Sequence, residues 1–289
     1  MKLRLSCLFV PALATVLAAA LPLAASAACL DEPQVAALYA SYQARQPAIN
    51  PEGLTAADGE CSRAKLNALL ARDLGAPVGY KAGLTNPAVQ KRFGADAPVW
   101  GTLYGPMLLA NGATVDAGFG ARPLFEADLL VRVSSDAINR ASTPELVLAA
   151  IDQVIPFIEL PDLVVQAPPK LNGAAITAIN VGARLGVLGT PIAVQRTAEF
   201  SNALRDMVAV VKGDGIELDR GKGSDVLGHP LNAVAWLATD MARAGQAMKV
   251  GDLISLGSFS KLLPPKPGLV VEVVYEGLPG TPSVMVKFK

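Results

Sequence analysis

From Pro77 to the C-terminus, short apolar runs alternate with glycine and proline, and this alternation restricts the chain to a strand-rich fold. The sequence holds 26 Gly and 22 Pro in 289 residues. Apolar runs bounded by such residues are typical of strands joined by turns. The predicted strands are 123–133, 155–160, 252–258, 269–276 and 283–288.

Helical spacing of apolar residues adds a second kind of element, so we predict an α+β fold. At Thr143-Pro144 a capping hydroxyl precedes a proline at the first helical position, which favours a helix start. Residues 28–76 are predicted to form a small helical N-terminal region, with a Pro- and Gly-containing loop over 47–60. The predicted helices are 33–46, 64–74, 143–154 and 230–248.

The first 27 residues have the pattern of a secretory signal peptide. Lys2 and Arg4 precede an apolar stretch, 5–23, and residues 25–27 (ASA) form an A-x-A cleavage site. We therefore expect a periplasmic or secreted protein with no membrane association after cleavage. A membrane anchor is one alternative, and a lipoprotein modified at Cys29 is another.

Cleavage would remove Cys7 and leave Cys29 and Cys61. An even pair of cysteines in an oxidising compartment favours a disulfide. Two buried free thiols are the alternative. A catalytic cysteine is disfavoured because the chain has a single histidine, His229, which does not lie near either cysteine in sequence.

The charge balance argues against nucleic acid as a partner. Lys and Arg number 25, Asp and Glu number 25, and removal of Lys2 and Arg4 leaves 23 basic against 25 acidic side chains. No basic excess remains to contact phosphates. A small anionic substrate would need a local cation instead.

Two acidic residues interrupt the apolar strand 123–133. Glu126 and Asp128 are two positions apart, so both side chains point to the same face of the strand. Adjacent carboxylates repel each other unless a cation lies between them. A hard divalent cation with oxygen ligands is one such cation; a solvated strand face is the alternative.

A third carboxylate and a lysine extend this pattern. Glu159 lies inside the apolar run 155–160, where a carboxylate needs a partner, a metal ion or an outlet to water. Three carboxylates suit Mg²⁺ or Mn²⁺ better than structural zinc. Lys81, between Gly79 and Gly83, could receive a substrate carboxylate or move a proton.

Five segments together resemble the 2-keto-4-pentenoate hydratase branch of the fumarylacetoacetate hydrolase superfamily. Residues 79–85 are similar to the branch's G-[HY]-K-[IV]-G-L-T segment, and 125–128 to its E-x-E metal motif. The resemblance covers about residue 75 to the end. The matching segments are 79–85 (GYKAGLT), 125–128 (FEAD), 157–162 (FIELPD), 226–238 (VLGHPLNAVAWLA) and 245–258 (GQAMKVGDLISLGS).

This resemblance implies a fold, a cofactor and a reaction. The implied fold is a mixed β-roll or barrel of the fumarylacetoacetate hydrolase C-terminal type over 77–289. The implied cofactor is Mg²⁺ or Mn²⁺ held by Glu126, Asp128 and Glu159. The implied reaction is hydration of an unsaturated 2-oxo acid by a homo-oligomeric enzyme. The residues implied at the substrate are Lys81, as the catalytic residue, with Gly83, Leu84 and Ser258.

The sequence departs from this branch in two places. Asp128 stands where the second ligand is usually Glu, and the segments 98–101 and 105–107 lack acidic residues that many relatives carry. Two alternatives therefore stay open beside the hydratase. One is a decarboxylase of a 2-oxo diacid from the same branch, and the other is a noncatalytic periplasmic protein that binds small acids.

Overall fold

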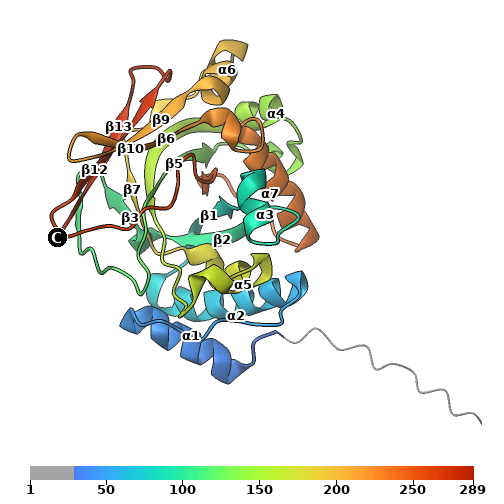
Figure 1. Cartoon of the computed structure of the whole chain (residues 1–289). Coiled ribbons are helices and arrows are strands. Elements are labelled where there is room, and N and C mark those ends of the chain that lie inside the picture. Colours follow the sequence, from blue (N-terminus) through green and yellow to red (C-terminus); the bar gives the residue numbers. More distant parts are fainter. Residues whose placement is uncertain (1–28) are drawn as a thin grey trace, which may run out of the picture.

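The computed structural model describes residues 29–289, so the predicted signal peptide, residues 1–27, lies outside the described part. Two mixed sheets with helices around them make up an α+β fold, as predicted (Figure 1). The helices are α1 (Glu32–Ala44), α2 (Ala56–Leu74), α3 (Pro87–Arg92), α4 (Pro144–Ala149), α5 (Gly173–Ala178), α6 (Ala198–Asp206) and α7 (Leu231–Arg243). The strands are β1 (Pro77–Gly83), β2 (Val99–Tyr104), β3 (Leu108–Ala110), β4 (Thr114–Val115), β5 (Glu126–Val133), β6 (Ile151–Leu160), β7 (Leu185–Leu188), β8 (Ile192–Ala193), β9 (Val208–Gly213), β10 (Ile216–Lys222), β11 (Leu253–Ser255), β12 (Val270–Glu276) and β13 (Ser283–Phe288).

The larger sheet has eight strands in the order β2-β1-β11-β5-β6-β7-β3, with β8 paired to β6. Strands β1 and β11 are parallel, whereas β5 is antiparallel to both β11 and β6. The smaller sheet has the order β10-β9-β12-β13-β4. Strand β5 thus lies inside the larger sheet with a neighbour on each side, and nearly all of its side chains are buried.

One face of the larger sheet packs against the smaller sheet and α7, and the other packs against the N-terminal helices. Ala127, Leu129 and Val131 of β5 belong to the first core, together with Val273 of β12. Leu130 belongs to the second core, which takes in residues of α1, α2 and α5. The alternation along β5 therefore sends successive side chains into two different cores.

Three predicted helix boundaries are wrong. The predicted helix 230–248 ends at Arg243, and the other two differ for identifiable reasons. The predicted loop 47–60 ends at Thr55, because Thr55 and Asp58 form a capping box that starts α2 at Ala56. The predicted helix 143–154 ends at Ala149, and β6 begins at Ile151. There, pairing with β5 and the two hydrogen bonds from Arg132 to Asp152 outweigh the local helical pattern.

The N-terminus of the described chain is attached to α2. Cys29 and Cys61 form a disulfide with a Cα–Cα distance of 5.7 Å. Leu30 N also donates to Ser62 Oγ at 2.9 Å, and Lys65 Nζ donates to Leu30 O at 2.8 Å. Within residues 29–289, no helix combines the length and the apolar character needed to cross a membrane.

Loss of the disulfide should lower the stability of the protein beginning at residue 28. The bond closes a loop with a sequence separation of 32 residues, for which chain entropy predicts a loss of about 4 kcal/mol in the free energy of unfolding. Urea titration of the Cys29→Ser/Cys61→Ser variant measures this loss. Thiol titration of the denatured wild-type protein should find no free thiol, and two reactive thiols would contradict the assignment.

His229 should make the fold less stable in mild acid. Its Nδ1 accepts from Leu231 N at 3.1 Å, so Nε2 carries the proton and donates to Ser201 O at 3.1 Å. Burial lowers the pKa of His229. The unfolded chain therefore binds the proton first, and stability falls as the pH drops below about 6.5.

Chemical denaturation between pH 5 and 7.5 measures this effect. In the His229→Gln variant, the decline in stability toward pH 5 should be shallower than in the wild type. Equal pH dependence of both proteins would show that His229 does not contribute.

Candidate metal and substrate site

Three buried carboxylates come together on β5 and β6. Glu126 is directly opposite Glu159 in the antiparallel register, and Asp128 is paired with Phe157, two positions further along. Cross-strand partners point to the same face, with Cβ atoms about 5 Å apart. Asp128 is fully buried, and Glu159 and Glu126 are 2% and 9% exposed. A solvated strand face, the alternative interpretation of these acids, is therefore excluded.

Neighbouring strands fix the carboxyl group of Asp128. Ser255 Oγ on β11 donates to its Oδ2 at 2.5 Å, and the main-chain N–H groups of Leu129 and Leu256 donate to Oδ1 at 2.6 and 3.2 Å. Tyr275 of β12 donates its hydroxyl proton to the main-chain oxygen of Asp128 at 2.5 Å. Asp128 is thus held from both sheets.

Lys81 is the cation of this cluster. It lies on β1 opposite Ser255 of β11 and is 3% exposed. Its Nζ forms an ion pair with Glu159 Oε1 and donates to Val181 O at 2.9 Å. One buried ammonium group therefore pairs directly with one oxygen of Glu159.

Without a metal ion, the electrostatics of the cluster favour the protonated forms of its carboxyl groups. Burial raises the pKa of Glu126 well above its usual range, and Glu159 adds repulsion while Lys81 opposes it. Burial and then Glu159 raise the pKa of Asp128 to about 7, against the hydrogen bond from Ser255. Three carboxylates therefore share one ammonium group, and an additional cation would stabilise their charged forms.

The donor set fits a hard divalent cation, although the side chains do not converge on one point. Among residues 29–289, no group of three or more His, Cys, Asp or Glu side chains is placed so that it could hold a metal ion as it stands. Lys81 forms an ion pair with Glu159, and both carboxylate oxygens of Asp128 already accept hydrogen bonds. The site nevertheless offers buried carboxylate oxygens, the ligand type that a hard divalent cation prefers. The three-ligand set stays a prediction, and it requires Lys81 to move from Glu159.

A left-handed turn orients Lys81. Asn180, Val181 and Gly182 all have positive φ, of 54°, 53° and 65°, a conformation that a β-branched residue such as Val181 rarely adopts. The Asn180 side chain stabilises the turn by accepting from Thr102 N at 2.8 Å and donating to Thr102 O at 3.0 Å. The turn thereby directs the Val181 carbonyl at Lys81 Nζ.

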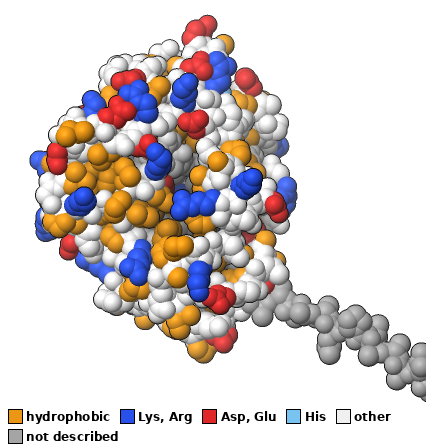
Figure 2. All heavy atoms as spheres, in the orientation of Figure 1, with side chains coloured by type: hydrophobic (Ala, Val, Ile, Leu, Met, Phe, Trp, Pro, Cys, Tyr) orange, Lys and Arg blue, Asp and Glu red, His pale blue; other side chains and the backbone are white. Residues whose placement is uncertain are grey.

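The predicted substrate residues lie around the same cluster. Gly83 is on β1, where a Cβ atom would come within 2.5 Å of Val181 Cγ1, and Leu84 follows with a φ of 54°. The Ser258 hydroxyl donates to Ser260 O at 2.7 Å, and it slightly opposes the rise that burial causes in the pKa of Glu126. Their contact with substrate stays a prediction. The space-filling view shows one face of the molecule, which is hollowed near its centre (Figure 2).

Sequence reasoning did not single out Ser255, Asn180 or Tyr275. Ser255 is a polar residue within a short apolar strand, which is a weak signal for a role at the site. Asn180 follows an ordinary helical segment, and nothing in the sequence around it indicates a role at the site. Tyr275 lies in an apolar run whose alternation gave no indication that its hydroxyl reaches β5 and β6.

The comparisons with known proteins agree with this architecture. No protein-family model matches the chain. A 2-keto-4-pentenoate hydratase of Paraburkholderia xenovorans is 31% identical over 201 residues, which cover 70% of this chain and 73% of the relative. The TodF product hydratase of Pseudomonas putida is 32% identical and covers 73% of this chain and 76% of the relative.

Solved structures give the same result for the fold. The 4-oxalocrotonate decarboxylase of Pseudomonas putida G7, in complex with magnesium and adipate, aligns with a TM-score of 0.77 and 27% identity. The alignment covers 90% of this chain and 99% of that structure. Fumarylpyruvate hydrolase of Pseudomonas aeruginosa shares the fold at a TM-score of 0.52 and 15% identity.

Fold and comparisons together define a protein of the fumarylacetoacetate hydrolase superfamily. Within it, the chain belongs to the 2-keto-4-pentenoate hydratase family, whose matched members are named hydratases and decarboxylases, and it is an enzyme. The predicted membership of this family is therefore confirmed.

Replacement of Glu126 by Gln should abolish binding of Mn²⁺ while leaving the fold intact, because the change removes charge at nearly constant shape. In the presence of chelator the variant should also melt at a higher temperature than the wild type at pH 8, since it removes a buried, repelled carboxylate. Calorimetric titration and thermal melts measure the two effects. Glu276→Gln, at an exposed position on β12, is the control, and undiminished Mn²⁺ binding by Glu126→Gln would contradict the site.

Replacement of Asn180 by Ala should lower kcat about tenfold with a smaller change in KM, because the turn that aligns Lys81 loses its two hydrogen bonds to Thr102. Val181→Gly keeps the main-chain oxygen and tolerates positive φ, so it should retain more activity than Asn180→Ala. Steady-state kinetics compare the variants. A wild-type kcat in Asn180→Ala would exclude this positioning role.

Proposed function

We propose that the enzyme is a divalent-metal-dependent hydratase that adds water to an unsaturated 2-oxo acid such as 2-hydroxypenta-2,4-dienoate. The observation that carries the proposal is the buried cluster of Glu126, Asp128 and Glu159 with Lys81 as its cation. Relatives at 31–32% identity that are named hydratases support this choice of reaction.

Each residue has a defined part in the proposed mechanism. Glu126, Asp128 and Glu159 would hold a Mg²⁺ or Mn²⁺ ion, which would act as a Lewis acid and polarise the substrate's 2-oxo group. Ser255 and the Leu129 N–H keep the Asp128 carboxylate fixed. Lys81, released from Glu159, holds a proton at Nζ beside the substrate and stays oriented by Val181 O.

The proposed reaction balances as two steps. The dienol loses its 2-hydroxyl proton and gains a proton at C5, which gives 2-oxopent-3-enoate. Water then adds across C3=C4, with hydroxyl at C4 and hydrogen at C3, to give 4-hydroxy-2-oxopentanoate. Lys81 Nζ is the ionisable group on the described chain that we assign to proton transfer, because it is the one cation in the cluster.

The proposed location of the enzyme rests on the N-terminal sequence and on the disulfide. The predicted leader and the Cys29–Cys61 disulfide support a periplasmic or secreted enzyme. Homo-oligomerisation stays a prediction from the family resemblance. Decarboxylase structures that contain magnesium and calcium support an oxygen-liganded divalent cation, and we propose Mg²⁺ or Mn²⁺ for this protein.

Decarboxylation of a 2-oxo diacid is the second candidate. It is favoured by the alignment with 4-oxalocrotonate decarboxylase, which covers nearly all of that structure, and by a curated decarboxylase at 29% identity. The same cluster would serve, because the electrons left by departing CO₂ would move into a polarised 2-oxo group. Detection of CO₂ separates this reaction from hydration.

Purified protein lacking residues 1–27 should remove the ultraviolet absorbance of 2-hydroxypenta-2,4-dienoate only when Mg²⁺ or Mn²⁺ is present. The expected product is 4-hydroxy-2-oxopentanoate, identified by mass spectrometry. Lys81→Met should lose most of the rate while keeping bound metal. Absorbance loss that persists in excess chelator, or CO₂ release from an oxalocrotonate without hydration of the dienoate, would contradict the hydratase.

A further inference from the structure

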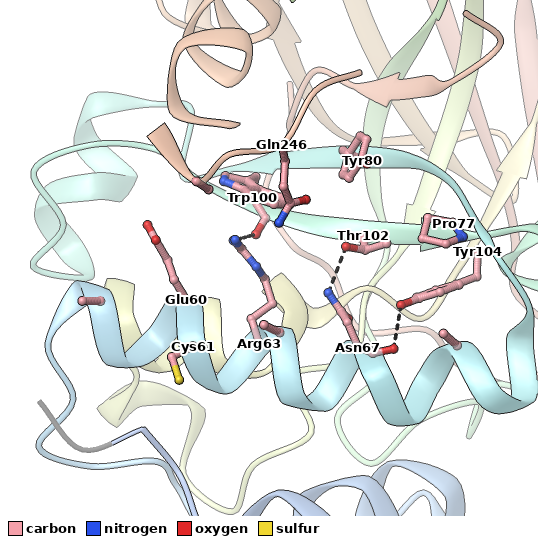
Figure 3. Close-up of a pocket in the computed structure, with 14 residues that line it drawn as sticks. Glu60, Cys61, Arg63, Asn67, Pro77, Tyr80, Trp100, Thr102, Tyr104 and Gln246 are labelled. Atoms are coloured by element: carbon pink, nitrogen blue, oxygen red, sulfur yellow. Dashed lines mark hydrogen bonds between the residues drawn. The ribbon is translucent and has the colours of Figure 1, made fainter. Parts of the chain in front are cut away.

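A cavity lies between α2, the edge of the larger sheet and the segment after α7 (Figure 3). Its volume is about 520 Å³, within the range of pockets that bind small molecules. Side chains of α2 form one wall, β1 and β2 form another, and Gln246 reaches over the opening (Figure 3). The lining residues that carry the argument are Arg63, Asn67, Tyr80, Trp100 and Thr102.

Arg63 is the cation of this cavity. It is 4% exposed and stacks on the Trp100 ring, with Cζ 3.4 Å from the ring centroid. Its Nη1 donates to Trp100 O at 2.6 Å, which uses one of the five N–H donors of a guanidinium group. Within residues 29–289, Arg63 has no ion-pair partner within 4.0 Å, although burial makes an uncompensated charge costly.

A second unsatisfied group lies one turn further along α2. Asn67 donates through Nδ2 to Thr102 Oγ1 at 2.9 Å, but its buried Oδ1 has no hydrogen-bond partner. Figure 3 shows Asn67 directed at β2, on the same side of α2 as Arg63. A guanidinium group with free donors and an amide with a free oxygen therefore border one cavity.

The acidic groups nearby do not satisfy Arg63. Asp240 accepts from Trp100 Nε1 at 3.0 Å and from Arg243 at 3.3 Å, so its charge is already paired. Glu60 lines the cavity but is exposed to solvent, where water and salt screen its charge. The buried interior of the cavity therefore keeps a positive character.

We propose that this cavity binds a small carboxylate with a planar apolar body. Arg63 would donate two parallel hydrogen bonds to the carboxylate, an arrangement that its fork of donors favours. The apolar body would lie among the rings of Trp100 and Tyr80, which pack edge to face at 5.6 Å. Asn67 Oδ1 would accept from a hydroxyl or amide group on the ligand.

This cavity is separate from the carboxylate cluster. Tyr80 and Lys81 are successive residues of β1, so their side chains point to opposite faces of the sheet. Trp100 and Thr102 line the cavity, whereas Gly101 between them faces Asn180 O on the Lys81 side. Binding in the cavity requires no metal, and its test is independent of the proposed hydratase.

Fluorescence of Trp100 tests the proposal. The chain has two tryptophans, so Trp236→Phe leaves Trp100 as the only indole of the protein lacking residues 1–27. Titration with benzoate in excess EDTA should change this fluorescence with a Kd of about 1 mM or tighter. Benzamide, a neutral molecule of nearly the same shape, should bind at least tenfold more weakly.

Two variants and a control complete the test. Arg63→Met should weaken benzoate binding at least tenfold, and Arg72→Gln, an exposed position on the same helix, should leave it unchanged. Asn67→Asp places a carboxylate beside the cavity while keeping Arg63, and it should weaken benzoate binding as well if Arg63→Met fails to fold. No benzoate binding, equal binding of benzamide, or undiminished binding by folded Arg63→Met or Asn67→Asp would overturn the proposal.

Discussion

The buried contact between Lys81 and Glu159 is the constraint on which the rest of the site depends. Two further carboxylates, Glu126 and Asp128, lie on the same face of the sheet. One ammonium group cannot balance three carboxylates in a low-dielectric interior, so protons or another cation must stabilise the cluster. This imbalance destabilises the metal-free protein, and under the proposed function it would favour the binding of a divalent cation. Under the proposed function, Glu126 would therefore contribute to metal binding while it lowers the stability of the metal-free protein.

The sheet order explains how residues distant in sequence reach this cluster. Strand β5 lies between β11 and β6, which brings Ser255 to Asp128 and Glu159 to Glu126. Strand β1 adds Lys81 from the other side of β11. The Tyr275 hydroxyl of the smaller sheet donates to the main-chain oxygen of Asp128 on β5 and accepts from the main-chain N–H of Phe157 on β6, so it ties together the two strands that carry the carboxylates.

The sequence could predict what depends on local pattern. Alternation along β5 placed Glu126 and Asp128 on one face, and the apolar run around Glu159 indicated burial. The start of α2 was missed although Thr55 and Asp58 form a recognisable capping box, and the start of β6 was missed because pairing with β5 decides it. Asn180 could not be found, because its role arises from a turn that reaches Thr102 only in the folded chain.

Anomalous diffraction from crystals grown with Mn²⁺ tests the central claim most directly, because it locates the ion independently of any assay. The account predicts one strong peak within about 2.2 Å of oxygens from Glu126, Asp128 and Glu159, with Lys81 Nζ moved away from Glu159 and still bonded to Val181 O. A crystal that contains Mn²⁺ elsewhere, with Lys81 still paired to Glu159 and no peak at the three carboxylates, would contradict it.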